Sequence, residues 1–171
     1  MKIPFISNKK LPPNADKETL AKSAYETAFN YELKYGCCAQ CVLASVKETV
    51  GMVTDETIKA GHGFTGGGAL TGVGACGALT GGLMALSCKH GRARNRFGLG
   101  RFKNNFEIGN ELVERFRKEF GGITCQELQQ KFTGRTFDLQ DKKESTEFNK
   151  ARKQECARAT ALVTQWVVEL L

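Results

Sequence analysis

The sequence lacks the features that would place it among β-sheet, membrane-spanning or secreted proteins. No segment alternates apolar and polar residues with the period of two that indicates a half-buried strand. Residues 61–88 contain no Asp, Glu, Lys or Arg, but this stretch has ten glycines and is mostly Gly, Ala and Thr. A membrane span needs about twenty predominantly apolar residues. The first ten residues also lack the apolar core of a signal peptide. We therefore expect a cytoplasmic protein without a membrane partner.

Three common cofactor motifs are incomplete. Residues 72–77 match G-x-G-x-x-G, yet no strand pattern precedes them and the following region is basic, which argues against dinucleotide binding. Cys38 and Cys41 form a Cys-x-x-Cys pair that follows a helical pattern instead of a strand, which argues against a thioredoxin-like site. No second close pair of cysteines completes a zinc site. The absence of Cys-x-x-Cys-His excludes covalent c-type haem.

Charge is unevenly distributed along the chain, which has 171 residues and a net charge of +7. One window without acidic residues carries six of the positive charges: Lys89, Arg92, Arg94, Arg96, Arg101 and Lys103. Such a window attracts phosphate or an acidic partner surface. No nucleic-acid recognition motif accompanies it, so we predict a mobile or partner-docking segment and no specific nucleic-acid site.

Apolar side chains recur at spacings of three and four through most of the chain, which predicts an all-α fold. We expect an irregular N-terminal arm over residues 1–13 and a single-domain helical bundle over residues 14–171. The patterns and caps predict helices over 14–36, 37–51, 54–60, 73–88, 102–120, from 124 onward, and through the C-terminal segment. A phenylalanine-rich stripe in 102–120, together with the glycine-rich helix, predicts a homodimer.

Seven cysteines in a cytoplasmic protein favour redox or metal chemistry over structural disulfides. Cys38 and Cys125 each open a predicted helix, where free N–H groups and the helix dipole favour a thiolate. Cys156 lies on the apolar face of the last helix. Beside Cys76, Gly77 and Gly81 leave one helix face bare, which predicts close approach of another helix, a cofactor or a second thiol.

This cysteine pattern resembles the C-GCAxxG-C-C family of redox-active proteins. The resemblance rests on Cys38–Leu43, on the Cys-Gly-Ala-x-x-Gly core at Cys76–Gly81, on Phe120–Leu128 around the third cysteine, and on Cys156. It covers roughly residues 30–170. Three cysteines are additions to the family pattern: Cys37, Cys41 and Cys88.

The resemblance implies redox activity, and three hypotheses follow. In the first, Cys38, Cys76, Cys125 and Cys156 form one shared pocket that works by thiol–disulfide chemistry, with Cys38 as nucleophile and Cys76 as its partner. The protein would then be an oxidoreductase with a redox partner that the sequence does not name. In the second, the same four cysteines hold an iron–sulfur cluster for electron transfer. In the third, the cysteines only pack inside a structural or partner-binding protein.

Overall fold

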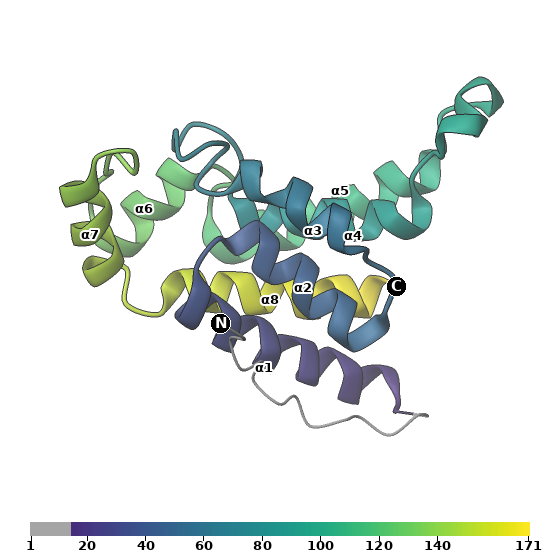
Figure 1. The fold of residues 1–171 in the computed structure, drawn as a ribbon, viewed down its shortest axis with the longest axis horizontal. Coiled ribbons are helices and arrows are strands. Elements are labelled where there is room, and N and C mark those ends of the chain that lie inside the picture. The colour runs from purple at the N-terminus through teal and green to yellow at the C-terminus, as the bar shows by residue number, and fades with distance from the viewer. Residues whose placement is uncertain (1–14) are drawn as a thin grey trace.

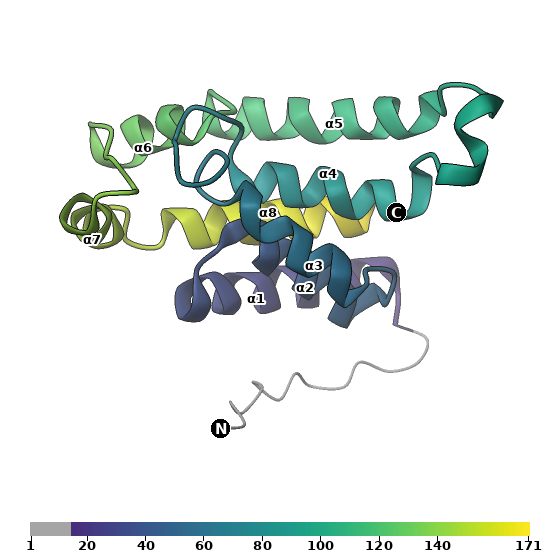
Figure 2. The ribbon, with the colours of Figure 1, turned by 45° about the horizontal axis from the view of Figure 1, so that its top comes forward.

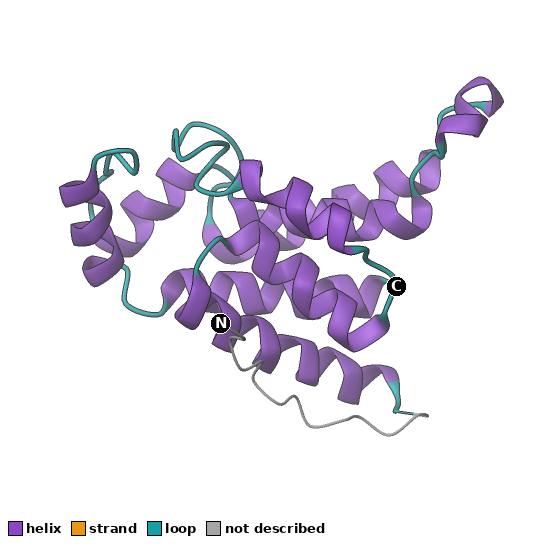
Figure 3. Cartoon of the chain, viewed as in Figure 1, coloured by secondary structure: helices purple, strands orange, loops and turns teal. Residues whose placement is uncertain are grey.

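The computed structural model describes residues 15–171, and this part of the chain is helical without any strand (Figure 3). The predicted all-α fold is therefore confirmed. The strand-like geometry present is limited to one isolated antiparallel bridge between Ala75 and Thr124. The predicted arm over residues 1–13 lies outside the described residues. Within residues 15–171, no helix is both long enough and apolar enough to cross a bilayer.

Helix boundaries follow local capping signals. Asp16, Thr54, Thr124 and Asp141 each accept a hydrogen bond from a backbone N–H of the helix that they open. The α-helices are α1 (Lys17–Tyr35), α2 (Cys38–Val50), α3 (Asp55–Gly61), α4 (Gly77–His90), α5 (Lys103–Phe120), α6 (Cys125–Thr133), α7 (Lys142–Ala151) and α8 (Glu155–Leu170). Two short 3₁₀ helices are η1 (His62–Phe64) and η2 (Arg94–Leu99).

The long helices stack around α8. Figure 2 shows α5, α4, α8 and α1 in successive layers, and α2 packs against α1, α4 and α8. The common core consists of fully buried apolar side chains from α2, α4, α5 and α8, among them Leu43, Val46, Leu86, Leu112, Phe116, Val163 and Val167. Because α2, α4 and α8 run in the same direction, their N-terminal ends meet at the end of the bundle covered by α6 and α7 (Figure 1).

The glycine-rich stretch differs from the sequence prediction. The helix expected from about Val73 begins only at Gly77, and the residues before it form a folded loop. Four of its glycines have positive φ: Gly66, Gly67, Gly68 and Gly72. The loop backbone pairs with the start of α6 instead of extending α4, because the Cys76 N–H donates to the Ile123 carbonyl at 2.7 Å and the Cys125 N–H donates to the Gly74 carbonyl at 3.0 Å. Cys76 is consequently the N-cap of α4.

The basic window forms the connection between α4 and α5, which projects away from the bundle (Figure 1). The Arg92 side chain links two backbone positions of this connection, since its Nη1 donates to the carbonyls of Phe97 and Gly100, both at 3.0 Å. Phe97 and Leu99 are exposed there. The docking role of this segment and the homodimer both stay predictions.

Candidate functional site

Five cysteines line one cavity of about 270 Å³ at the end of the bundle where the helix N-termini meet. They are Cys37, Cys38, Cys76, Cys125 and Cys156. The structure thus brings together the four cysteines selected from the sequence, although they are far apart along the chain. Their roles in catalysis or ligand binding stay predictions.

Each of these four cysteines lies at the N-terminal end of a different helix. Cys38 is the first residue of α2, Cys76 is the N-cap of α4, Cys125 is the first residue of α6, and Cys156 is the second residue of α8. A helix N-terminus presents free N–H groups and the positive end of the dipole. The four helix ends therefore favour negative charge on sulfur in a cavity that is otherwise mostly apolar.

Gly77 and Gly81 allow α4 to approach the start of α2 at backbone distance. A Cβ atom at Gly77 would lie 2.6 Å from the Cys38 Sγ, and a Cβ atom at Gly81 would lie 2.7 Å from the Ala39 carbonyl oxygen. Both distances are too short for a real side chain. The partners that approach these glycines are thus a thiol and a helix, while cofactor binding by Gly77 and Gly81 stays a prediction.

Cys38 and Cys76 are neighbouring thiols whose pKa values shift in opposite directions. The hydrogen bond with Cys76 lowers the pKa of Cys38, and the backbone N–H groups of Gly66 and Ala39 add to this effect against the opposing effect of burial. The same hydrogen bond and burial raise the pKa of Cys76 well above its ordinary value. The environment therefore favours ionisation of Cys38 before Cys76.

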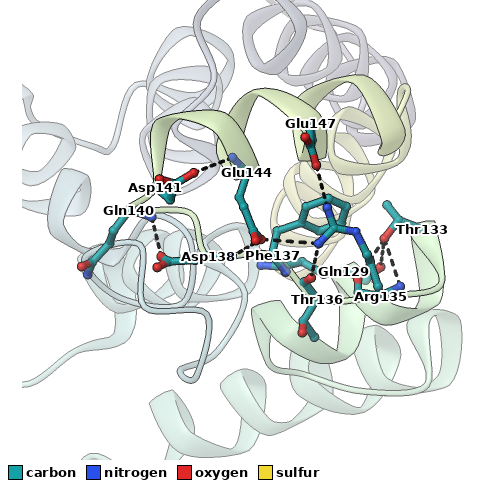
Figure 4. Close-up of polar contacts among 10 residues, drawn as sticks. All are labelled: Gln129, Thr133, Arg135, Thr136, Phe137, Asp138, Gln140, Asp141, Glu144 and Glu147. Atoms are coloured by element: carbon teal, nitrogen blue, oxygen red, sulfur yellow. Dashed lines mark hydrogen bonds and ion pairs between the residues drawn. The ribbon is translucent and has the colours of Figure 1, made fainter.

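Cys125 is oriented by Gln129, which is fully buried one turn later on α6. The Phe137 N–H donates to Gln129 Oε1 at 2.7 Å (Figure 4). The amide nitrogen of Gln129 is therefore directed toward Cys125 and donates to its Sγ at 3.5 Å. Burial raises the pKa of the Cys125 thiol, and the hydrogen bond from Gln129 partly offsets this rise.

The segment that carries Phe137 is held in place by a small ionic network between α6 and α7. Arg135 Nη2 lies 2.8 Å from Glu147 Oε2, and the Arg135 guanidinium stacks on the Phe137 ring at 3.5 Å from its centroid (Figure 4). Glu144 Oε2 accepts from the Asp138 N–H at 2.9 Å. These contacts fix the Phe137 N–H, and with it the orientation of the Gln129 amide.

Cys156 faces a buried ion pair that joins helices distant in sequence. Arg152 Nη1 lies 3.0 Å from Glu32 Oε1, and the two side chains are only 17% and 4% exposed. Burial raises the pKa of Cys156 to about 12, against the opposing effect of the nearby Arg152 charge. Burial also raises the pKa of Glu32, while the Arg152 charge opposes this rise.

Glu32, Arg152 and Gln129 were not selected from the sequence. The sequence could have indicated Glu32, because it follows Ala28 by four positions and therefore lies on the apolar face of α1. Arg152 lies in a polar segment near the end of α7, where nothing in the sequence distinguishes it from exposed basic residues. Cys37, which the sequence left without a role, also lines the cavity.

The remaining two cysteines do not line the cavity. Cys41 is buried on α2, and its thiol donates to the Gly36 carbonyl at 2.8 Å. Burial raises its pKa, so it stays protonated. Cys88 is exposed near the opposite end of α4.

The four predicted thiols are the donor type that iron–sulfur clusters use. In the part of the chain that the structure describes, however, no group of three or more His, Cys, Asp or Glu side chains is placed to hold a metal ion. A cluster would have to draw the four thiols into a new arrangement. Iron–sulfur binding therefore stays a prediction.

Comparison with known proteins gives one match. Residues 36–170 match the family described as "Putative redox-active protein (C_GCAxxG_C_C)". The matched range includes all five cysteines of the cavity. No curated protein and no solved structure matches the chain.

Proposed function

The chain belongs to the C_GCAxxG_C_C family of redox-active proteins, and from this premise we propose that it is an oxidoreductase that works by thiol–disulfide exchange at Cys38 and Cys76. The observation that carries the proposal is that Cys38 and Cys76 line one cavity, where the Cys38 sulfur lies against Gly77, the residue next to Cys76. The pKa of Cys38 is lowered and that of Cys76 is raised. A thiolate beside a protonated thiol is the reduced form that disulfide exchange requires.

The reaction has two steps. The Cys38 thiolate attacks a substrate disulfide, forms a mixed disulfide with one half of the substrate and releases the other half as a thiolate. Cys76 then loses its proton and attacks the Cys38 sulfur, which forms the Cys38–Cys76 disulfide and releases the second half. The protein dithiol loses two electrons and the substrate disulfide gains them. Reduction of the protein runs the same steps in reverse.

Cys125 and Cys156 are the other two thiols of the proposed pocket. Burial raises the pKa of both, so they are protonated at neutral pH and react after Cys38. The backbone bonds between the glycine-rich loop and α6 connect Cys125 to Cys76. Because Cys125 and Cys156 both line the cavity, their position supports a further exchange in which they take over the disulfide.

The test is a redox titration of the purified, reduced protein in buffers of oxidised and reduced dithiothreitol, with disulfides mapped by mass spectrometry. We expect a reversible Cys38–Cys76 disulfide in the wild type. Cys38→Ser and Cys76→Ser should each abolish it. Cys88→Ser, which removes an exposed thiol away from the cavity, is the matched control and should titrate as the wild type does.

Two results would overturn the proposal. One is reversible oxidation that persists unchanged in Cys38→Ser. The other is protein purified without oxygen that contains iron and acid-labile sulfide in amounts that Cys38→Ser and Cys76→Ser lose. The second result would support the cluster hypothesis, in which Cys38, Cys76, Cys125 and Cys156 bind a group that supplies one-electron transfer.

A further inference from the structure

Three buried oxygen atoms on the cavity wall have no hydrogen-bond partner within residues 15–171. They are Glu32 Oε2, Thr65 Oγ1 and Thr160 Oγ1. Glu32 is 4% exposed and Thr160 is fully buried, so bulk water does not reach them freely. Buried polar atoms in folded proteins are nearly always paired. Bound water in the cavity can pair with such atoms, even though the rest of its lining is mostly apolar.

We propose that Glu32 is the proton acceptor of the thiol pair, and that it takes the proton which Cys76 releases when the Cys38–Cys76 disulfide forms. The inference rests on the proposed function. It adds a residue that neither the cysteine motif nor the family description assigns. The hydroxyl groups of Thr65 and Thr160 also line the cavity, and in this proposal they pass the proton through bound water.

The geometry of the ion pair leaves one oxygen of Glu32 for this task. Arg152 Nη1 binds Oε1, and Arg152 is itself oriented by Asn149, whose Oδ1 accepts from Arg152 Nε at 2.9 Å. Within residues 15–171, Oε2 has no hydrogen-bond partner. Among the residues that the structure describes, Glu32 is the only carboxylate that lines the cavity. Its Oε2 atom can accept a proton from a thiol and later return it.

The charged and titratable groups that face Glu32 come from every neighbouring element. They are Arg152 at the end of α7, Cys37 before α2, Cys38 and Cys41 on α2, and Cys156 on α8. Cys41 lies beside Glu32 but donates its proton to the Gly36 carbonyl. Burial raises the pKa of Glu32, which makes its carboxylate a stronger base.

The proposed step is balanced. The Cys76 S–H bond breaks, its proton passes to Glu32 Oε2, and the sulfur electrons form the bond to Cys38. The bond between Cys38 and the substrate sulfur breaks, and that sulfur leaves as a thiolate with the bonding pair. The substrate disulfide is the oxidant. In the reverse direction, Glu32 returns the proton to Cys76.

The test measures the rate of closure of the Cys38–Cys76 disulfide from the mixed disulfide as a function of pH. We expect Glu32→Gln to close about a hundredfold more slowly than the wild type at neutral pH, within the range of a lost general base. Its rate should keep rising with pH where the wild-type rate has levelled off. Glu26→Gln, the same change at an exposed position of α1, is the matched control. Glu32→Asp, which keeps the carboxylate, should retain part of the wild-type profile.

Circular dichroism verifies that each variant is folded, and the alkylation rate of Cys38 shows whether its thiolate is intact. Should Glu32→Gln misfold, Thr160→Val supplies the test, because it removes one hydroxyl from the path at nearly constant volume and should also slow closure. A pH profile of Glu32→Gln or Thr160→Val equal to that of Glu26→Gln would overturn the inference. If the wild type forms no Cys38–Cys76 disulfide at all, the proposed function fails instead.

Discussion

The contact between α4 and α2 at Gly81 gives a sharp test of how the site is assembled. In Gly81→Ala, the new Cβ would lie 2.7 Å from the Ala39 carbonyl oxygen and 3.0 Å from the Ala39 Cα. These are backbone atoms, so no side-chain rotation relieves the overlap. The two helices must move apart, and the movement occurs next to Cys38 on one helix and near Cys76 on the other.

Helix propensity predicts that Gly81→Ala stabilises the protein, whereas packing predicts that it destabilises the protein. Alanine stabilises a helix interior by about 0.5–1 kcal/mol relative to glycine. Overpacking a tight contact costs about 1–3 kcal/mol, and an unyielding backbone favours the upper part of that range. We therefore expect a net destabilisation of about 1–2 kcal/mol. With a urea m-value of about 2 kcal/mol per M, the unfolding midpoint should fall by about 0.5–1 M.

Urea unfolding followed by circular dichroism measures this shift, and the redox titration follows the Cys38–Cys76 pair in the same variant. Gly109→Ala on α5 is the matched control, because its Cβ would meet only the end of the Leu83 side chain at 3.2 Å, which can rotate. It should be as stable as the wild type or slightly more stable. A Gly81→Ala protein that is at least as stable as the wild type would refute the reasoning.

Two further predictions concern charge. Burial raises the pKa of Glu32 in the folded protein above its ordinary value of 4.5, so its protonated form favours folding and the free energy of unfolding should fall as the pH rises from 4.5 through the raised pKa. Glu32→Gln should lack this fall in urea unfolding at a series of pH values, and an equal fall in both proteins would contradict the assignment. The basic connection between α4 and α5 should bind an acidic protein surface with an affinity that decreases steeply with salt. A pull-down in which replacing Arg94 and Arg96 by Gln changes nothing would argue against that docking role.

Several features of the fold followed from the sequence because their causes are local. The spacing of apolar residues predicted the helices, and Asp16, Thr54 and Thr124 cap them as their side-chain chemistry requires. The start of α4 was predicted wrongly. Its helix was expected from about Val73, but the backbone before Gly77 bonds to the start of α6, and that partner lies about fifty residues away in the sequence.

The candidate site likewise depends partly on local sequence and partly on contacts between distant parts of the chain. The sequence identified Cys38, Cys76, Cys125 and Cys156 through motif and helix position, but it carried no information on the distances between them. Their convergence depends on α2, α4 and α8 running in the same direction, and on α6 being fixed against the glycine-rich loop.

Only the tertiary structure revealed the polar groups of the cavity. Glu32 and Arg152 are separated by 120 positions, and each looks like an ordinary charged residue of a helix until the other is placed beside it. Burial then changes their chemistry, since a carboxylate taken out of water changes its pKa and needs a partner. Sequence determined which side chains face inward on each helix. The packing of the helices decided which of those side chains meet, because acidity and reactivity depend on neighbours that local sequence does not specify.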